Sequence, residues 1–249
     1  MIRVQEENWW QEVFDQKYID TYEDIITLSQ TEKEVDFLVR LFRRYEVQSV
    51  VDVACGYGRH SIPLARRGFS ITGIDQSEYF IAKAKSGASG ATFIRDDIRY
   101  FRLAEKFDAA INMFTSFGYF HDDEENQKAL DNIGRSLKSG GVFVLDNINP
   151  NVLVRRVAEG NRKKRNTLSN GIILTTEEHI HGKTWVIKRS WDSQSYVAYI
   201  RLFVVDEIKE MLERAGFKIH ETFGSFDGDS FDAERSLRCI IVSKKLWES

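Results

Sequence analysis

The chain has 249 residues, which suits one α/β domain with a small insertion. Apolar residues make up 42% of it and charged residues 29%, as in an ordinary globular protein. The formal net charge of -3 excludes a global attraction to nucleic acid or to an anionic membrane. No segment reaches the roughly 18 uninterrupted apolar residues that a membrane-spanning helix needs.

The N-terminal segment and the cysteines indicate the compartment. The segment lacks the basic start and apolar run of a secretory signal. Cys55 and Cys239 do not have the spacing of a metal site, and a disulfide framework is not expected. The acids Asp227, Asp229 and Asp232 lack the spacing and terminal Glu of a calcium loop. We therefore expect a cytoplasmic protein without a metal site, with a solvated acidic loop.

Two helical segments are predicted first, as a cap over about residues 8–45. In the first, Phe14, Tyr18, Tyr22 and Ile25 recur at spacings of four, four and three, which predicts one helical face.

The second helix of this cap has a predicted start. Thr31 and Glu34 form a capping-box pattern at its beginning. Its apolar stripe comprises Val35, Leu38, Val39 and Phe42.

Strands and helices then alternate. The predicted strands are short apolar runs, over residues 49–54, 69–75, 91–95, 107–114 and 142–148. The predicted helices between them cover residues 61–67, 77–85 and 122–137, the last ending at Gly140-Gly141. This rhythm predicts a Rossmann-like, doubly wound, mostly parallel sheet covered by helices.

The pattern changes after Pro150. Apolar and polar residues alternate over about residues 165–204, with turn signals at Asn170-Gly171, His181-Gly182 and Asp192-Ser193. This predicts a small inserted sheet of three antiparallel strands.

The α/β pattern resumes after the insertion. A helix over 205–215 closes at Gly216, and strands over 217–223 and 237–244 predict an antiparallel C-terminal edge hairpin. The large sheet then has seven strands, and residues 1–249 form a single domain.

The turn from Asp52 to Gly58 carries the clearest chemical signal. It stands where the first strand gives way to a helix, and Gly56 and Gly58 let a ligand approach the backbone closely. The N-terminus of the next helix offers free N–H groups and the positive end of its dipole. The alternative is a tight turn that binds nothing.

Asp75 ends the second strand and supports the ligand interpretation. An acid there can accept hydrogen bonds from both ribose hydroxyls, the alternative being a helix N-cap. Ser61 occupies the third glycine position of the dinucleotide fingerprint, so that fingerprint fails. The two features predict a nucleoside ligand at the carboxyl ends of the strands.

Five segments in order resemble the motifs of class I S-adenosylmethionine-dependent methyltransferases, and the resemblance covers nearly all of the chain. The first is Asp52-Val-Ala-Cys-Gly-Tyr-Gly, with Ala54 where many members have glycine. The others are residues 71–77, 95–99, 107–114 and 137–145. Residues 212–217 also resemble the helix end that precedes the edge hairpin of this family.

The resemblance implies a methyltransferase with S-adenosylmethionine as its cofactor. It assigns Asp97 to the adenine amino group, Ile98 to the ring, and the strand end at 112–114 to the methyl-transfer site. The predicted cofactor residues are Asp52, Ala54, Cys55, Gly56, Tyr57, Gly58, Asp75, Gln76, Asp97, Ile98, Asn112, Met113 and Phe114. Tyr18 and Tyr22 are added as rings that contact the sulfonium cation, the alternative being aromatic side chains packed in the core.

The run Thr115–Phe120 resembles a subgroup that acts on small molecules, including sugar amines, which implies a small-molecule acceptor. Phe117, Tyr119 and Arg201 are the candidate acceptor contacts, with Arg201 suited to an anionic group. Tyr119 and His121 are the candidate catalytic residues, because His121 could remove a proton near neutral pH. The alternatives are a solvated histidine and an exposed strand arginine. Cys55 is explained by the cofactor turn and is not expected to be a nucleophile.

Two other functions stay open. A basic cluster predicts an RNA or protein methyltransferase, although the net charge favours a solvated loop. It comprises Arg155, Arg156, Arg162, Lys163, Lys164 and Arg165. The second alternative is a nucleotide-binding module without catalysis. We expect no membrane partner, and we expect the inserted strands either to cover the pocket or to pair two chains in a homodimer.

Overall fold

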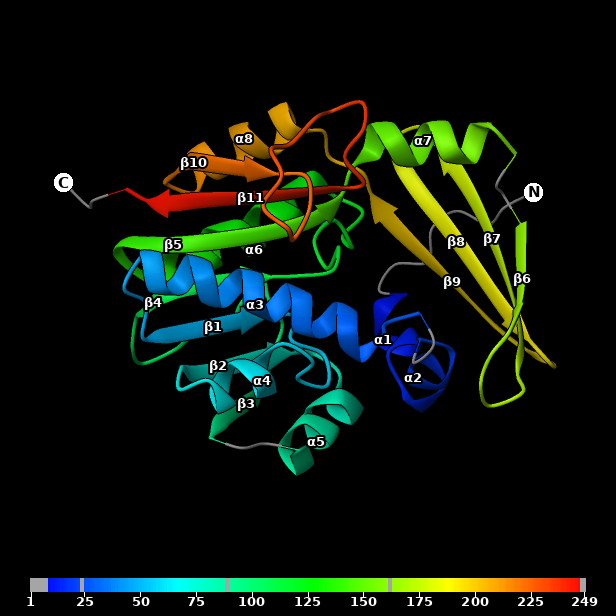
Figure 1. The fold of residues 1–249 in the computed structure, drawn as a ribbon, viewed down its shortest axis with the longest axis horizontal. Helices are drawn as coiled ribbons and strands as arrows, with labels where there is room; N and C mark the ends of the chain where they lie inside the picture. Colours follow the sequence, from blue (N-terminus) through cyan, green and yellow to red (C-terminus); the bar gives the residue numbers. More distant parts are fainter. Residues whose placement is uncertain (1–8, 23–24, 88–89, 161–162, 247–249) are drawn as a thin grey trace.

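The computed structural model describes residues 9–22, 25–87, 90–160 and 163–246 (Figure 1). The helices are α1 (Trp10–Val13), α2 (Gln16–Tyr22), α3 (Leu28–Arg44), α4 (Ser61–Arg66), α5 (Glu78–Gly87), α6 (Asp123–Ser136), α7 (Pro150–Ala158) and α8 (Val205–Arg214). The strands are β1 (Ser49–Val53), β2 (Ser70–Asp75), β3 (Ala91–Arg95), β4 (Phe107–Asn112), β5 (Leu137–Ile148), β6 (Lys163–Thr167), β7 (Ile173–His181), β8 (Thr184–Trp191), β9 (Gln194–Arg201), β10 (Phe217–Phe223) and β11 (Arg238–Lys245).

These strands form two sheets. The larger sheet has the order β10-β11-β5-β4-β1-β2-β3 and is parallel except for β11, which runs antiparallel between β10 and β5. The smaller sheet is antiparallel, with the order β6-β7-β8-β9. Figure 1 shows the small sheet beside the large one, with α1 and α2 at the junction. The predicted fold class is confirmed.

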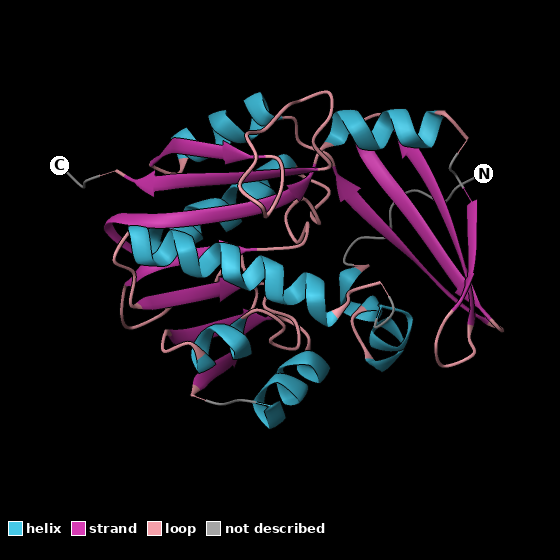
Figure 2. Cartoon of the chain, viewed as in Figure 1, coloured by secondary structure: helices cyan, strands magenta, loops and turns pink. Residues whose placement is uncertain are grey.

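Alternating side chains of the parallel strands face two helical layers. In β1, Val50 is buried in a cluster with residues of α3 and α4, while Val51 packs in a second cluster with α6 and α8. Figure 2 shows α3 lying across one face of the large sheet. Burial on both faces explains why these strands read as continuous apolar runs.

The N-terminal helices differ from the prediction. The aromatic segment breaks into α1 and α2, because Asp15 caps α2 by accepting hydrogen bonds from the Lys17 and Tyr18 amides at 2.9 and 3.2 Å. The predicted capping box of Thr31 and Glu34 is wrong. Helix α3 begins one turn earlier, and its N-cap is Thr27, whose hydroxyl accepts from the Gln30 amide at 3.1 Å.

Three further predictions need correction. Residues 155–156 lie in helix α7, not in a loop, and Asn149 caps that helix by accepting from the Asn151 amide at 3.1 Å. The small sheet has a fourth strand, β6, at its edge. Helix α6 ends at Ser136, and Gly140-Gly141 lie inside β5, because the backbone is already extended at Leu137.

The two sheets are joined at the loop that follows β4. The Arg201 amide of β9 donates a hydrogen bond to the Gly118 carbonyl at 2.7 Å. Trp9 adds aromatic packing across the junction, with ring centroids 5.0 Å from Tyr119 and 6.5 Å from Tyr199. This junction fixes the small sheet and the N-terminal helices over the carboxyl ends of β1, β2 and β4.

We expect Gly118→Ala to destabilise the protein by about 2–3 kcal/mol. Gly118 has φ +99°, and an added Cβ would lie 2.4 Å from the backbone oxygen of Arg201. Gly68→Ala is the matched control, because φ there is +94° and nothing lies within 4 Å of the added Cβ. Urea denaturation measures both, and equal losses of stability would contradict the close approach at Gly118.

Candidate active site

A cavity opens at the carboxyl ends of β1, β2 and β4. Its wall combines the turn after β1, the ends of β2 and β4, the loop after β3 and the N-terminal helices. The lining residues are Trp10, Phe14, Tyr18, Ile26, Ala54, Cys55, Gly56, Tyr57, Arg59, His60, Asp75, Gln76, Phe80, Asp97, Ile98, Met113, Phe114, Ser116, Tyr119 and Phe120. Most of the predicted cofactor residues are therefore brought together.

The turn after β1 takes a left-handed backbone at three alternate positions. Gly56 and Gly58 have φ of +57° and +85°, and Ala54 has φ +61°. The left-handed region costs a residue with a Cβ roughly 1–2 kcal/mol, so Ala54 is a strained position at the cavity wall. The turn presents its backbone to the cavity, as a ligand-binding loop requires.

Asp75 is held against this turn. Its Oδ2 accepts from the Gly56 amide at 2.8 Å and its Oδ1 from the Ser77 amide at 2.9 Å. Burial raises the pKa of Asp75 to about 6, while the Ser77 and Gly56 amides oppose the rise. Asp75 therefore lies in the cavity wall, as predicted for a ligand contact, and also caps the N-terminus of α5, which was the alternative prediction.

Four predicted cofactor residues are absent from the cavity wall, and three of them belong to the strands and the turn. Asp52 is buried and accepts from the Ser61 hydroxyl at 2.6 Å. Asn112 donates to the Val53 carbonyl at 2.9 Å and so ties β4 to β1. Gly58 faces Ile62, whose side chain would lie 3.0 Å from an added Cβ. These residues support the turn through contacts with β4 and α4 and do not line the cavity.

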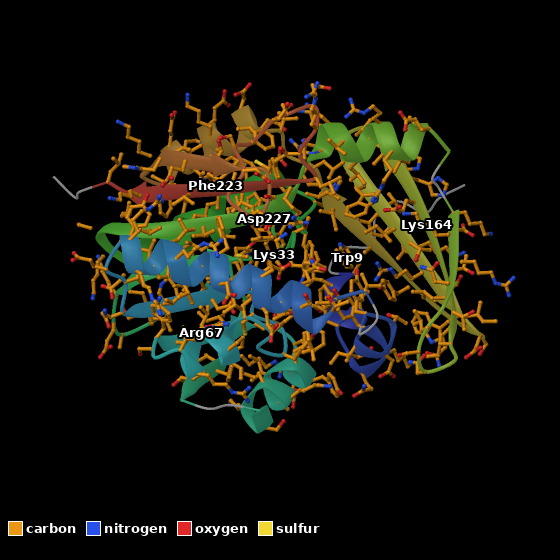
Figure 3. The ribbon with its side chains drawn as sticks, viewed as in Figure 1. Trp9, Lys33, Arg67, Lys164, Phe223 and Asp227 are labelled. Atoms are coloured by element: carbon orange, nitrogen blue, oxygen red, sulfur yellow. The ribbon has the colours of Figure 1, made fainter. Side chains whose placement is uncertain are left out.

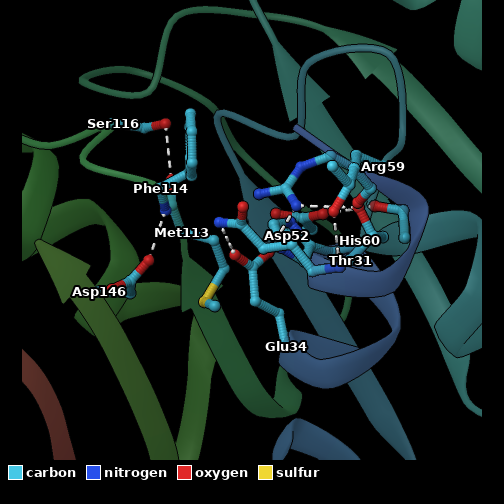
Figure 4. A network of polar contacts seen from close by, with 12 residues as sticks. Thr31, Glu34, Asp52, Arg59, His60, Met113, Phe114, Ser116 and Asp146 are labelled. Carbon is cyan, nitrogen blue, oxygen red and sulfur yellow. Dashed lines mark hydrogen bonds and ion pairs between the residues drawn. The ribbon is translucent and has the colours of Figure 1, made fainter. Parts of the chain in front are cut away.

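A buried ion network supports the other side of the turn (Figure 4). Glu34 of α3 is 1% exposed, and its Oε2 lies 2.5 Å from Arg59 Nη1 and 2.8 Å from His60 Nε2. Burial alone would raise the pKa of Glu34, but the His60 hydrogen bond and the charges of His60 and Arg59 hold it at about 2. The network fastens α3 to the start of α4.

Arg59 was missed by the sequence prediction. Its Nη1 is bound by Glu34 and by the Thr31 hydroxyl at 3.1 Å, but its Nη2 is buried without a partner in the structure. The residue lines the cavity, and its guanidinium lies 4.8 Å from the centroid of the Phe114 ring. The glycine pattern of the adjacent turn carries no information about Arg59, and only the fold shows that its guanidinium points into the cavity wall.

The end of β4 is strained in the same region. Phe114 and Thr115 have φ of +60° and +62°, unusual for residues with branched or bulky side chains. The pair is held by Asp146, whose Oδ2 accepts from the Phe114 amide at 2.8 Å and whose carbonyl accepts from the Thr115 amide at 2.9 Å (Figure 4). The strain turns Met113, Phe114 and Ser116 into the cavity wall.

The loop after β3 brings Asp97 and Ile98 to the wall. Asp97 Oδ2 accepts from Arg99 Nη2 at 2.6 Å, and Arg99 also pairs with Glu125 at 2.7 Å. The Arg99 amide and Nε also donate to Asp97, at 2.9 and 3.0 Å. A carboxylate has about four acceptor sites, so three donors leave room for one more from a ligand.

Aromatic side chains from distant segments close the cavity. The Phe14 ring stacks on Tyr119 at 5.8 Å and contacts Tyr18 edge-on at 5.0 Å. Trp10 contacts Phe120 edge-on at 5.0 Å. Trp10, Phe14 and Phe120 were not among the predicted site residues. The backbone carbonyls of Trp10 and Phe14 accept hydrogen bonds from the Gln76 and Ser77 side chains, which pins the N-terminal segment to the site.

Of the predicted acceptor residues, only Tyr119 lines the cavity. Burial raises its pKa above 10.0. Phe117 packs against Phe203 in the core, with ring centroids 5.2 Å apart. Arg201 pairs with Asp123 at 3.0 Å and with Glu207 at 2.9 Å, so its charge is already neutralised.

His121 and Tyr22 also stand outside the cavity wall. His121 is exposed in the turn before α6, and its role as a base stays a prediction. Tyr22 lies behind the wall, stacked on Tyr18 at 4.0 Å and 6.5 Å from the Phe114 ring.

Burial raises the pKa of the Cys55 thiol well above 9.0, which disfavours the thiolate that a nucleophile needs. Within the described ranges no cluster of three or more His, Cys, Asp or Glu side chains could hold a metal ion. None of the described helices has the length and apolar character needed to cross a membrane.

The basic cluster is dispersed in the structure. Arg155 and Arg156 of α7 pair with Glu234 and Glu178 at 3.1 and 2.9 Å, and Lys163 of β6 pairs with Glu177 at 2.8 Å. Figure 3 shows Lys164 at the outer edge of the small sheet. Arg162 lies outside the described residues. The acidic loop also pairs locally, with Asp227 2.6 Å from Lys33.

The chain resembles known methyltransferases. A methyltransferase domain model matches residues 50–141. The glycine/sarcosine N-methyltransferase of Parasynechococcus marenigrum (strain WH8102) is 26% identical over 235 residues, covering 91% of this chain and 83% of that protein. The dTDP-3-amino-3,4,6-trideoxy-alpha-D-glucopyranose N,N-dimethyltransferase of Streptomyces venezuelae is 36% identical over 104 residues, covering 42% and 44%. The CcbJ methyltransferase of Streptomyces caelestis superposes with a TM-score of 0.82 at 17% identity, covering 98% of this chain and 100% of that chain.

The matched domain spans the glycine turn, Asp75, Asp97 and the end of β4, and the solved methyltransferase superposes on nearly the whole chain. Residues 50–141 match a methyltransferase domain and the chain has the fold of a solved methyltransferase, which supports a class I S-adenosylmethionine-dependent methyltransferase. The cavity fits this cofactor, because it offers a left-handed glycine turn, a buried acid at the end of β2 and an unpartnered guanidinium nitrogen.

We expect Glu34→Gln to destabilise the protein by about 3 kcal/mol at pH 7, since it removes the carboxylate partner of buried Arg59. The folded pKa of about 2 lies below the ordinary 4.5, so this contribution is full above pH 4.5 and is lost as the pH falls toward 2. The stability difference from wild type should therefore shrink between pH 5 and pH 3. Urea denaturation measures it, with the exposed Glu32→Gln as control. A difference that does not change with pH would contradict this account.

Proposed function

We propose that this methyltransferase acts on a small-molecule amine. The supporting observation is the aromatic wall contributed by the N-terminal helices and by the loop after β4. This wall leaves a confined, largely apolar space above the glycine turn, which suits a small acceptor better than a residue on a folded macromolecule. Both curated relatives described above are named as N-methyltransferases of small molecules.

Different residues of the cavity wall bind different parts of the cofactor. Asp75 accepts hydrogen bonds from the ribose hydroxyls, Asp97 accepts from the adenine amino group, and Ile98 packs on the ring. Arg59 offers its free Nη2 to the carboxylate of the methionyl part. Tyr18 faces the sulfonium with its ring, a contact worth about 0.5–2 kcal/mol. When bound, S-adenosylmethionine supplies a methyl group already activated on sulfur.

The chain's remaining contribution is alignment of the acceptor. Well-oriented reactants gain roughly 7–11 kcal/mol from position alone. The neutral Tyr119 hydroxyl holds the acceptor by a hydrogen bond and does not serve as a base at neutral pH, since burial raises its pKa. Desolvation in the aromatic wall disfavours an ammonium, so the acceptor enters as the neutral amine whose lone pair attacks.

A macromolecular acceptor is less well supported. An RNA-binding surface needs a continuous patch of free cations, but Arg155, Arg156 and Lys163 are each paired with a glutamate. The remaining described cations of this cluster, Lys164 and Arg165, lie on the edge strand β6.

We expect Arg59→Gln to weaken S-adenosylhomocysteine binding at least about tenfold, because a charged hydrogen bond to the carboxylate is lost. The affinity for 5′-methylthioadenosine, which lacks the amino-acid part, should not change. Asp75→Ala should weaken both ligands, because both contain the ribose. Isothermal titration calorimetry of the two variants with the two ligands gives the four comparisons. Equal losses of both ligands in Arg59→Gln would contradict the carboxylate assignment.

We expect methyl transfer to low-mass amines and not to RNA or protein. Purified enzyme is incubated with S-adenosylmethionine and a panel of amino acids, amino sugars and nucleotide-linked amino sugars. S-adenosylhomocysteine release and a product heavier by one methyl group report turnover, with Asp75→Ala as background. Methylation confined to RNA or protein fractions would overturn the proposed acceptor class.

A further inference from the structure

Arg189 of β8 is a buried cation at the junction of the two sheets. The residue is 8% exposed. Its guanidinium lies 3.9 Å from the centroid of the Tyr22 ring, and Nη1 donates to the Tyr196 hydroxyl at 3.1 Å. Its Nε is buried without a hydrogen-bond partner.

No carboxylate of the described residues lies within ion-pair distance of Arg189. Other arginines of the molecule that are largely buried have such a partner, as Arg59 has Glu34 and Arg201 has Asp123. Burial of an unpaired cation costs several kcal/mol, so the cluster lacks an anion that would balance its charge.

Tyrosine hydroxyls surround the guanidinium but leave its charge in place. Burial raises the pKa of Tyr18, Tyr119 and Tyr196 above 10.0, so these hydroxyls stay protonated at neutral pH. They can donate hydrogen bonds to an anion that binds Arg189. Four tyrosines and one arginine thus form an anion-compatible cluster, with Tyr22 as the fourth ring.

The cluster adjoins the methyl-transfer cavity. Tyr18 and Tyr119 are members of both, and Tyr18 stacks on Tyr22 at 4.0 Å. The charges of Asp75 and Arg189 both act on the pKa of the Tyr119 hydroxyl, so both groups lie near Tyr119. An acceptor that contacts Tyr119 therefore has Arg189 nearby.

We propose that Arg189 binds an anionic group of the methyl acceptor, a carboxylate or a phosphate, so that the acceptor is an amine that also carries a negative charge. This inference rests on the proposed small-amine function. The planar guanidinium fork suits both oxyanions, and the free Nε supplies one of the two parallel donors that such binding uses. The anion binds at one end of the acceptor and leaves the amine free toward the methyl group.

The test uses the protein saturated with S-adenosylhomocysteine. Sodium acetate and inorganic phosphate are titrated separately against sodium chloride at constant ionic strength, and the melting temperature and tryptophan fluorescence are followed. We expect saturable binding of at least one anion to wild type and an affinity at least about tenfold weaker for Arg189→Gln. Preference for acetate or for phosphate identifies the anionic group.

Lys188→Gln is the matched control, because this exposed lysine neighbours Arg189 on β8 and its loss removes the same charge. It should bind the anions as wild type does, and S-adenosylhomocysteine affinity should be equal in all variants. Arg189→Met should melt, without ligand, at or above the wild-type temperature, since it removes an unbalanced buried charge.

Two results would overturn the inference: no saturable anion binding to wild type, or unchanged binding in Arg189→Gln. A ligand-free Arg189→Met that melts well below wild type also overturns it, because Arg189 is then a structural residue. Failure to bind S-adenosylhomocysteine at all would instead refute the cofactor site on which the proposed function depends.

Discussion

The buried carboxylate of Glu34 is the constraint on which the cavity wall at the glycine turn depends. It joins α3, which covers one face of the large sheet, to Arg59 and His60 at the start of α4. The glycine turn between β1 and α4 is strained at Ala54, and strain persists only where surrounding contacts over-determine the backbone. Asp52 anchors the same helix through Ser61, so the turn is fixed from two sides. One buried ion network thus orders the backbone of the glycine turn and the arginine beside it.

The sequence was sufficient where local pattern and topology coincide. Continuous apolar strands alternating with capped helices predict a parallel sheet, and such a sheet brings the carboxyl ends of β1, β2 and β4 to one edge. The positions of the turn, Asp75, Asp97 and Phe114 along the chain therefore predicted their meeting in the cavity wall. The antiparallel hairpin of β10 and β11 followed from the same reasoning.

The failures share a different cause, because they concern side chains whose partners are distant in sequence. Glu34 fits a capping box by spacing, yet α3 begins at Thr27 and the carboxylate binds Arg59, 25 residues away. Arg201 resembles an exposed strand charge until Asp123 appears beside it. Spacing cannot separate these cases, since the energy of a buried ion depends on the partner that the tertiary fold supplies. The burial of Phe117 could not be predicted either, because its partner Phe203 is also distant in the sequence.

Groups of opposite charge adjoin the cavity. Asp75, with a pKa of about 6, lies in the cavity wall at the end of β2, and Arg189 lies outside that wall beside Tyr22 and Tyr196. Tyr119 lies in the wall and near both groups. The parallel sheet alone supplies only Asp75, because Arg189 comes from the inserted strand β8 and Tyr18 from the N-terminal helices. The added segments, packed together through Trp9, thus give a widely used fold an aromatic wall and a buried cation that the parallel sheet by itself does not provide.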